Sequence, residues 1–386
     1  MCYNLEVKMD VANIANSTNN VKMGCGAVIF GFVAFILSFF ILFLNEANYV
    51  KNIRKANFIK SNVVSVNSYD AINNNKLVHF SGNITTNAVL GDNYVRVNTP
   101  VLDRTVKMYQ WEERSHKSSS GHSTSYRYEK VWSEHEINSA HFRRSGHDNP
   151  PMPLKSKDFI ANSAKIGDFT IDRTVLNVIN PVQDLYLNNL KGRYSIEDGT
   201  VIFIPNRRTN NGIGDLKISY KYVPVNTQVS VIAQQMNDTL TAFSTLKGKA
   251  KYVIALAETG SVSAETMIKH FEDSNAKHAW MMRGIGLLAM FIGLLCLASP
   301  ITTLLSFIPI FGYLGNKTIA LLAIIVSICL SAITIAVAWI AVRPEIAIPV
   351  VIAAAGAIFF YLTSGGGGSK NIPPAPINPQ QPMPPV

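Results

Sequence analysis

Long apolar runs on either side of one long polar block define the organisation of this chain. The first run, residues 24–44, reads GCGAVIFGFVAFILSFFILFL and contains no charged side chain. About 20 such residues, rising ~1.5 Å each, cross the ~30 Å hydrocarbon core of a bilayer. Further apolar runs occupy residues 284–304, 318–341 and 346–363. Buried helices of a soluble protein rarely run this long without a polar face, so the pattern predicts four transmembrane helices.

A cleaved signal peptide is the alternative explanation for the first run. The run is longer than the apolar region of a typical signal peptide, and the residues before it carry both signs of charge. The residues after it read NEANYV and contain no cleavage site of the A-x-A kind. We therefore expect residues 24–44 to be an uncleaved anchor that follows a polar tail, residues 1–23.

The polar block, residues 45–283, is typical of a β-rich domain. Short β-branched or aromatic runs such as KLVHFSGNI, VKMYQWEER, YRYEKVW and LKISYKYV are bounded by Gly, Asn, Asp and Pro. From Ser263 the spacing of apolar residues becomes helical and predicts a juxtamembrane helix that enters the second span near Trp280. The fold class expected is an α+β membrane protein with four transmembrane helices and a large β-rich extramembrane domain between helices 1 and 2.

The two ends of the block 108–132 show alternating aromatic residues around a serine-rich middle. Tyr109 and Trp111 fall on one face of a strand, and so do Tyr126, Tyr128 and Trp132. This pattern predicts a β-hairpin with a long loop, and we expect its aromatic face to pack on the domain core. After the last span, residues 364–386 are rich in glycine and then proline, which is typical of a disordered tail.

Candidate chemistry in the polar block is sparse. Five histidines cluster between residues 116 and 147, and the candidate metal ligands among them are His135, His141 and His147. The block contains no cysteine, no nucleophile elbow and no phosphate-binding loop. The spans carry no charge at mid-depth, which argues against a transporter. We expect a protein that is not an enzyme and binds no cofactor; the alternative is a membrane-bound, metal-dependent enzyme that uses the histidine-rich hairpin.

The net charge of +10 raises the question of nucleic acid. The basic residues are scattered, and the tightest group, Lys51 to Lys60, directly follows the first span. Lipid headgroups explain this group better than a nucleic acid does. The expected partners are therefore the lipid bilayer and unknown membrane-associated proteins. Small residues in the spans, Gly286, Ala289, Gly293 and the run 353–357, also predict homo-oligomers.

Five segments form a distinctive set: MYQWEE at 108–113, YRYEKVWSEHEINSAHF at 126–142, GHDNPPMP at 146–153, GDLKISY at 214–220 and WMMRGIGLLAMFIGLL at 280–295. They resemble the LUMA family, also called transmembrane protein 43. The order of one span, a large polar domain and three clustered spans also fits. The residues of these motifs singled out as structural are Tyr109, Gln110, Trp111, Glu112, Trp132, Asn149, Pro150, Gly214, Asp215, Trp280 and Arg283.

This resemblance implies a multi-pass membrane scaffold or organising protein without enzymatic activity. It implies that the domain at 45–283 faces the lumen, or the periplasm of a bacterium. The location implied is the endoplasmic reticulum and nuclear envelope of a eukaryote, or the inner membrane of a prokaryote. The histidine-bearing insert SHKSSSGHSTS and the Gly/Pro-rich tail have no counterpart in the family pattern and inherit nothing from it.

Overall fold

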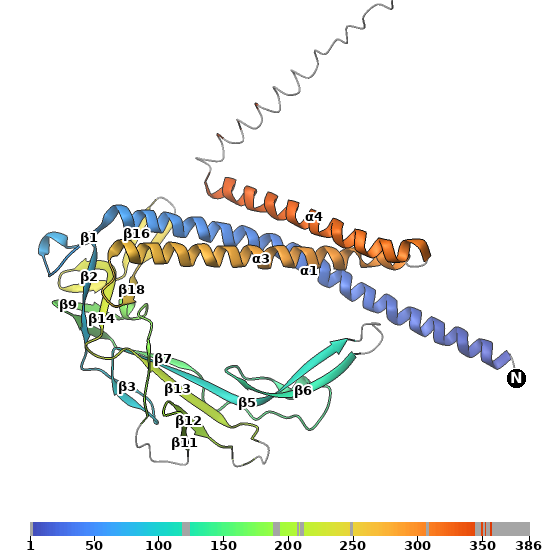
Figure 1. Ribbon diagram of the computed structural model, residues 1–386, viewed down its shortest axis with the longest axis horizontal. Coiled ribbons are helices and arrows are strands. Elements are labelled where there is room, and N and C mark those ends of the chain that lie inside the picture. The colour runs from blue at the N-terminus through green and yellow to red at the C-terminus, as the bar shows by residue number, and fades with distance from the viewer. Residues whose placement is uncertain are drawn as a thin grey trace, which may run out of the picture. The chain divides into compact units, whose positions relative to one another are not determined.

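The computed structural model describes residues 3–117, 124–187, 194–206, 208, 212–247, 250–305, 309–343, 349, 352 and 356. The chain divides into two compact units. The helical unit contains residues 1–51 and 275–386, and the β unit contains residues 52–274. Figure 1 shows the long helices of the first and the sheets of the second.

Three long helices account for three of the four apolar runs. They are α1 (Tyr3–Asn62), α3 (Ala264–Leu305) and α4 (Pro309–Val342). Among the described residues, three stretches are long and apolar enough to cross a membrane: Gly26–Asn62, Ala264–Ala298 and Thr318–Val342. The expected spans at 24–44, 284–304 and 318–341 fall in these helices. The fourth, at 346–363, lies outside the described residues apart from isolated positions, so the count of four stays a prediction.

The helices that contain the first and second spans extend further than the apolar runs. α1 begins at Tyr3 and therefore includes most of the segment for which the sequence predicts a tail. No glycine or proline interrupts residues 3–23, which is consistent with helix there. The juxtamembrane helix is confirmed as the first part of α3, where the hydroxyl of Ser263 accepts a hydrogen bond from the N–H of Thr266 at 3.2 Å.

Glycines bring α1 and α3 into close contact within the helical unit (Figure 1). A Cβ atom added to Gly293 would lie 2.8 Å from the backbone nitrogen of Phe35 and 3.0 Å from the carbonyl oxygen of Gly31. One added to Gly286 would lie 2.6 Å from the side chain of Leu42. Two of the small residues expected to join separate copies, Gly286 and Gly293, thus contact α1 of the same chain. The homo-oligomer itself stays a prediction.

The first sheet of the β unit closes on itself. Its strand order is β1-β2-β8-β9-β15-β14-β18, and β14 also pairs with β2, so that five of its strands form a small barrel. The apolar core lies inside and includes Phe80, Phe169 and Val231. The strands are β1 (Val63–Ser65), β2 (Leu77–Thr85), β8 (Ser163–Ile166), β9 (Phe169–Asp172), β14 (Gln228–Met236), β15 (Thr239–Thr241) and β18 (Leu256–Thr259).

Both chain ends of the β unit pack on the outside of this barrel. Ala56 and Ile59 of α1 and Met267 of α3 are buried in one cluster with Leu77 and Ile232 of the barrel strands. Lys60 and Glu272 add an ion pair of 2.7 Å between the same two helices. The helices that carry the first two spans therefore continue into the β unit.

The second sheet has the order β11-β12-β13-β5-β6, with β7 on β5 and β10 on β13. One of its faces is covered by a second core that includes Val106, Met108 and Ile218. The strands are β5 (Val101–Lys117), β6 (Thr124–Ser133), β7 (Lys157–Ile160), β10 (Gln183–Asp184), β11 (Ser195–Glu197), β12 (Val201–Ile204) and β13 (Leu216–Tyr222). The remaining elements are the hairpins β3 (Val89–Gly91) with β4 (Arg96–Asn98) and β16 (Phe243–Lys247) with β17 (Ala250–Ile254), the helix α2 (Arg173–Leu176), and the turns η1 (Ala71–Asn73) and η2 (Ser139–His141).

The predicted hairpin at 108–132 is confirmed as β5 and β6, which pair from Met108 with Ser133 to Lys117 with Thr124. Most of its serine-rich loop lies outside the described residues. The predicted packing of its aromatic face on the core is wrong. The buried face of β5 carries the even-numbered residues, such as Val106 and Met108, because their neighbours on β13 are the apolar ones. The aromatic residues point to the opposite face.

Candidate functional site

Residues of the family motifs continue the hydrogen bonding along the edge of β5 beyond the point where β13 ends. Asn149 accepts a hydrogen bond from the N–H of Trp111 at 2.7 Å, and its amide nitrogen donates to the carbonyl oxygen of Trp111 at 2.9 Å. A side-chain amide has the same donor and acceptor as a peptide group. Asn149 therefore takes the place of a neighbouring strand at the open edge of β5.

Between the end of β13 and Asn149, the backbone groups of Gly214 and Asp215 bind those of Tyr109 on the same edge of β5. The N–H of Tyr109 donates to the carbonyl oxygen of Asp215 at 2.9 Å, and the N–H of Gly214 donates to that of Tyr109 at 2.8 Å. Gly214 has a φ of +91°, and a Cβ there would lie 2.4 Å from Asn206 Nδ2 and 2.8 Å from Pro150 Cγ. Only glycine fits this turn without displacing its neighbours.

Gln110 fixes the start of the segment that follows β6. Its side chain is completely buried; Nε2 donates to the carbonyl oxygen of His135 at 3.0 Å, and Oε1 accepts from the N–H of Ile137 at 2.8 Å. Together with Asn149, it ties both ends of the segment 135–149 to β5. We call this segment the anchored loop. The polar atoms of both amides bind backbone groups, so they hold the loop in place.

The aromatic face of the hairpin lies beneath the anchored loop. The ring of His147 stacks on Tyr128 with centroids 3.8 Å apart and meets Trp111 edge-on at 4.7 Å. Tyr109 and Trp132 are 5.1 Å apart, and the ammonium of Lys217 lies 4.9 Å from the Trp132 ring. These half-buried rings form a rigid platform for the loop.

Glu113 and Tyr128 connect the platform to the loop backbone. The Tyr128 hydroxyl donates to Glu113 Oε2 at 2.5 Å, and the same oxygen accepts from the N–H of Arg143 at 2.6 Å. The hydrogen bond from Tyr128 and the N–H of Arg143 lower the pKa of the Glu113 carboxyl below its usual value. Partial burial and the bond to Glu113 raise the pKa of Tyr128. The carboxylate is therefore held as an acceptor for the loop.

A second polar cluster joins three helices of the helical unit. Glu46 of α1 is fully buried, and its carboxylate accepts from Arg283 of α3 through Nε at 2.7 Å and Nη2 at 2.8 Å. Trp339 of α4 donates its indole N–H to the same carboxylate at 2.8 Å, and Asn45 donates at 3.2 Å. Each oxygen thus has two donors, and all three described spans contribute.

Aromatic rings surround the guanidinium of this cluster. Its central carbon lies 5.3 Å from the ring centre of Tyr49 and 4.7 Å from that of Trp280. Trp280 is 69% exposed, as expected for an aromatic side chain at the membrane–water interface. The motif residues Trp280 and Arg283 thus have a structural role that connects the helices.

The comparisons with known proteins agree with these motifs. A family model described as transmembrane protein 43 matches residues 108–344. Transmembrane protein 43 of Homo sapiens is 31% identical over 362 residues, which cover 88% of this chain and 90% of the human protein. The chain belongs to the transmembrane protein 43 family.

Other relatives extend the family to rodents and insects. Transmembrane protein 43 of Mus musculus is 30% identical over 343 residues, covering 83% of this chain and 85% of that protein. The transmembrane protein 43 homolog of Drosophila melanogaster is 25% identical over 361 residues, covering 86% of this chain and 93% of that protein. No solved structure matches the chain.

In this family member the candidate metal ligands lie apart. His135 contributes its carbonyl oxygen to Gln110, His141 is exposed in η2, and His147 stacks on Tyr128. Within the part of the chain that the structure describes, no three His, Cys, Asp or Glu side chains are gathered as metal ligands. Of the other motif residues, Glu112 forms a 2.8 Å ion pair with Arg114 of its own strand.

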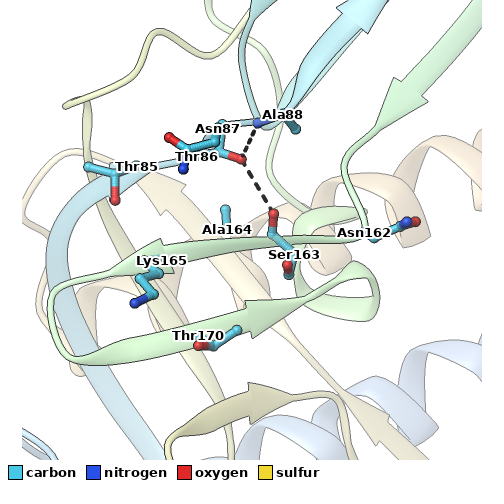
Figure 2. Close-up of a pocket in the computed structure, with 9 residues that line it drawn as sticks. All are labelled: Thr85, Thr86, Asn87, Ala88, Asn162, Ser163, Ala164, Lys165 and Thr170. Atoms are coloured by element: carbon cyan, nitrogen blue, oxygen red, sulfur yellow. Dashed lines mark hydrogen bonds between the residues drawn. The ribbon is translucent and has the colours of Figure 1, made fainter.

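A hollow of the β unit, lined mainly by threonine, asparagine and serine residues, lies where β2 and β8 separate (Figure 2). The two strands pair only at Ile84 with Ile166 and at Thr85 with Lys165. Beyond this point, Thr86 accepts from the N–H of Ala88 at 3.1 Å and donates to the carbonyl oxygen of Ser163 at 3.5 Å. The hollow measures about 580 Å³, and its lining contains no carboxylate or histidine that could act as a general acid or base.

Sequence reasoning missed Glu46 and Trp339. Glu46 is the first charged residue after the first apolar run, and Arg283 directly precedes the second. Opposite charges at the matching ends of two antiparallel spans are a sequence signal that the two side chains pair. Trp339 has no comparable signal, because an aromatic residue near the end of a span is typical of any interface.

Proposed function

We propose that this protein is a membrane-anchored scaffold whose β unit binds a protein partner through the anchored loop. The main support for this proposal is the set of hydrogen bonds that fixes the anchored loop on the β5–β6 hairpin. The side chain of Gln110 binds the backbone at the first end of the loop, and the side chain of Asn149, at the second end, binds the backbone of Trp111 on β5. In the middle, Glu113 and the Tyr128 hydroxyl accept hydrogen bonds from loop N–H groups. Loops that a rigid sheet positions in this way commonly carry binding functions.

The composition of the loop supports a protein partner. It exposes Arg143 and Arg144 next to the half-buried ring of Phe142, and His141 and Asp148 are exposed as well. A preformed surface with arginine and an aromatic residue resembles the centre of many protein interfaces. Because the loop is already ordered, binding would lose little conformational entropy.

The anchoring of the β unit supports a role at the membrane. Its first and last residues lie in α1 and α3, which also contain two of the candidate membrane spans. A domain tethered at both ends stays at the bilayer surface, where it meets membrane partners at a high effective concentration. We place this domain on the lumenal or periplasmic side as part of the proposal.

Site-specific photo-crosslinking in intact membranes tests this function. A photoreactive amino acid replaces Arg144 in the loop or, as the control, exposed Lys76 on the barrel. We expect an adduct of discrete mass from the Arg144 position only, and we expect Asn149→Asp to abolish it. Adducts from neither position, or from Lys76 alone, would contradict the proposal. Elemental analysis that finds stoichiometric metal, lost on His141→Ala, would support the metal-dependent enzyme instead.

A further inference from the structure

The outer strand of the β5–β6 hairpin is an unusually open sheet edge. β6 runs for ten residues and pairs without interruption with β5. Within the described residues, β5 is its one strand neighbour. Figure 1 shows the hairpin extending past the other strands of its sheet. Natural edge strands are usually short, bulged or interrupted by proline, because a long regular edge pairs with other chains.

The pairing of β5 with β6 determines which backbone N–H and C=O groups of β6 point outward, away from β5. Tyr109 and Trp111 direct their backbone N–H groups toward Asp215 and Asn149, away from β6. In an antiparallel pair, residues that exchange hydrogen bonds alternate with residues that do not. The residues opposite them, Trp132 and Lys130, therefore direct their backbone groups outward, and so do Tyr128 and Tyr126.

The chain covers the other edge of the hairpin and leaves this one accessible. The anchored loop leaves the end of β6, binds Gln110, and reaches Trp111 through Asn149 at the open edge of β5. His135 of the loop binds the side chain of Ser133, the last residue of β6. Further along β6, the loop contacts the side chains of Tyr126 and Tyr128 on one face. In the described part of the chain, no hydrogen bond reaches the outward backbone groups of Tyr126, Tyr128 or Trp132.

We propose that β6 pairs antiparallel with β6 of a second copy of this chain, about a two-fold axis at Tyr128. In this register Arg127 lies directly opposite Glu129 of the second copy, and the symmetry repeats the pair. Tyr126 lies opposite Lys130 of the second copy, an arrangement suited to a cation–π contact. Opposite charges directly across an antiparallel pair stabilise it, so the sequence TSYRYEKVW is complementary to itself.

A shift of the axis by one or two residues toward Lys130 removes this complementarity. With the axis at Glu129, this carboxylate faces its own copy, and with the axis at Lys130, two ammonium groups meet. Like charges directly opposite each other destabilise a sheet. Arg127 forms a 3.2 Å ion pair with Glu129 of its own chain, but its side chain is 81% exposed, so its guanidinium is accessible to Glu129 of a second copy as well.

Disulfide trapping in membranes tests the register. Two differently tagged full-length chains lack the four native cysteines; one carries Arg127→Cys and the other Glu129→Cys. Residues at these two positions would form a non-hydrogen-bonded pair with Cα atoms about 4.5 Å apart, within the range of a disulfide. We expect oxidation to link the two tags. The control pair, Arg127→Cys with Val131→Cys, lies two residues out of register and should link at least several-fold less.

Charge exchange gives a second, independent readout. Arg127→Glu and Glu129→Arg should each weaken self-association roughly tenfold, because each creates two like-charge pairs across the axis. Mixing the two variants should restore association between them. The repulsion inside each chain is the same before and after mixing, so restoration can only arise between copies. Absence of both the cross-link and the restoration, or equal linking in the control pair, would overturn the proposal.

Discussion

The carboxylate of Glu46 and the guanidinium of Arg283 form a two-point ion pair, with Oε1 to Nε at 2.7 Å and Oε2 to Nη2 at 2.8 Å. The pair joins α1 to α3, and the indole of Trp339 adds α4 to the same carboxylate. Charged groups among transmembrane helices are tolerated where they pair with each other and with further donors. This cluster therefore defines how the three described spans meet.

We expect Arg283→Ala and Glu46→Ala each to destabilise the helical unit by about 3–5 kcal/mol, because each leaves a buried charge without its partner. The double variant should cost clearly less than the sum, since it leaves neither charge unpaired. Unfolding of the full chain in mixed detergent and SDS measures both effects. Arg283→Lys, which keeps the charge and loses the two-point geometry, should fall between. Strictly additive losses would show that the two residues do not interact.

The close contact between α1 and α3 predicts a position-specific effect of larger residues in α3. Gly293→Leu should destabilise the helical unit by about 1–3 kcal/mol, because its Cβ would meet the backbone of α1. Gly284→Leu is the matched control, since a Cβ at Gly284 meets no atom within 4 Å. The same SDS titration compares them. Equal effects at the two positions would mean that helix propensity, and not contact with α1, explains the loss.

The amide of Asn149 predicts a difference between two chemically identical substitutions. Asn149→Asp should loosen the anchored loop, because a carboxylate cannot donate to the carbonyl oxygens of Trp111 and Ile137. The expected cost is about 1–3 kcal/mol. Asn138→Asp is the control, since Asn138 only accepts, from the N–H of Ala140, and an aspartate accepts equally well. Hydrogen exchange at the Ile137 and Arg143 amides, which the anchored loop donates to Gln110 and Glu113, should accelerate in the first variant and stay unchanged in the second.

The sequence predicts the spans and the hairpin well because both depend on local patterns. Lipid requires unbroken apolar runs, and the two faces of β5 and β6 meet different surroundings, so their residues alternate. β14 lacks this signal because both of its faces are covered. Val231 lies inside the barrel while Ile232 packs toward α1 and α3, so QVSVIAQQM shows no alternation.

The sequence could not predict the hydrogen-bond partners of the side chains in the candidate site, for a different reason. Gln110 and Asn149 belong to recognisable motifs, but their hydrogen bonds join residues 25 to 38 positions apart in the chain. The buried Ser230 likewise depends on Ser81, 149 positions away, at 2.7 Å. Composition and period describe which side chains are buried; they contain no information on which distant backbone group satisfies a buried polar atom.

A largely buried acid in the β unit, Asp92, predicts a pH dependence of stability. Asp92 accepts hydrogen bonds from Arg104 and, at 2.9 Å, from the hydroxyl of Tyr220. Burial alone would raise the pKa of Asp92, but the N–H of Tyr94, Arg104 and Tyr220 together hold it below its usual value. A lowered folded pKa adds stability above the unfolded pKa of about 3.9, and this stability is lost as the pH falls through the folded pKa.

Asp92→Asn should therefore lower the unfolding temperature of the β unit more at pH 7 than at pH 3, with a difference of about 1 kcal/mol in stability, because the contribution of the ionised carboxylate begins to fall below the unfolded pKa. Leaving Arg104 buried without its counter-ion costs about 3–5 kcal/mol at neutral pH. Thermal unfolding followed by circular dichroism at both pH values measures this difference. Asp238→Asn, at an exposed turn, should have little effect at either pH. An equal loss at pH 7 and pH 3 would show that the charge of Asp92 contributes nothing.

Asp103 should show the opposite sign, because it lies directly opposite Asp158 on the neighbouring strand β7. Burial and then the charge of Asp158 raise the pKa of Asp103. A raised folded pKa means that the ionised form is disfavoured in the folded state, so stability is lost as the pH rises through that pKa. Asp103→Asn should then stabilise the β unit by about 0.5–1 kcal/mol at pH 7, and this gain should vanish below about pH 4. Asp158→Asn should give a gain of the same sign, and the double variant should gain no more than either single one, because one substitution already removes the repulsion. A loss of stability at pH 7 would mean instead that Asp103 is held mainly by Lys221, its neighbour on β13.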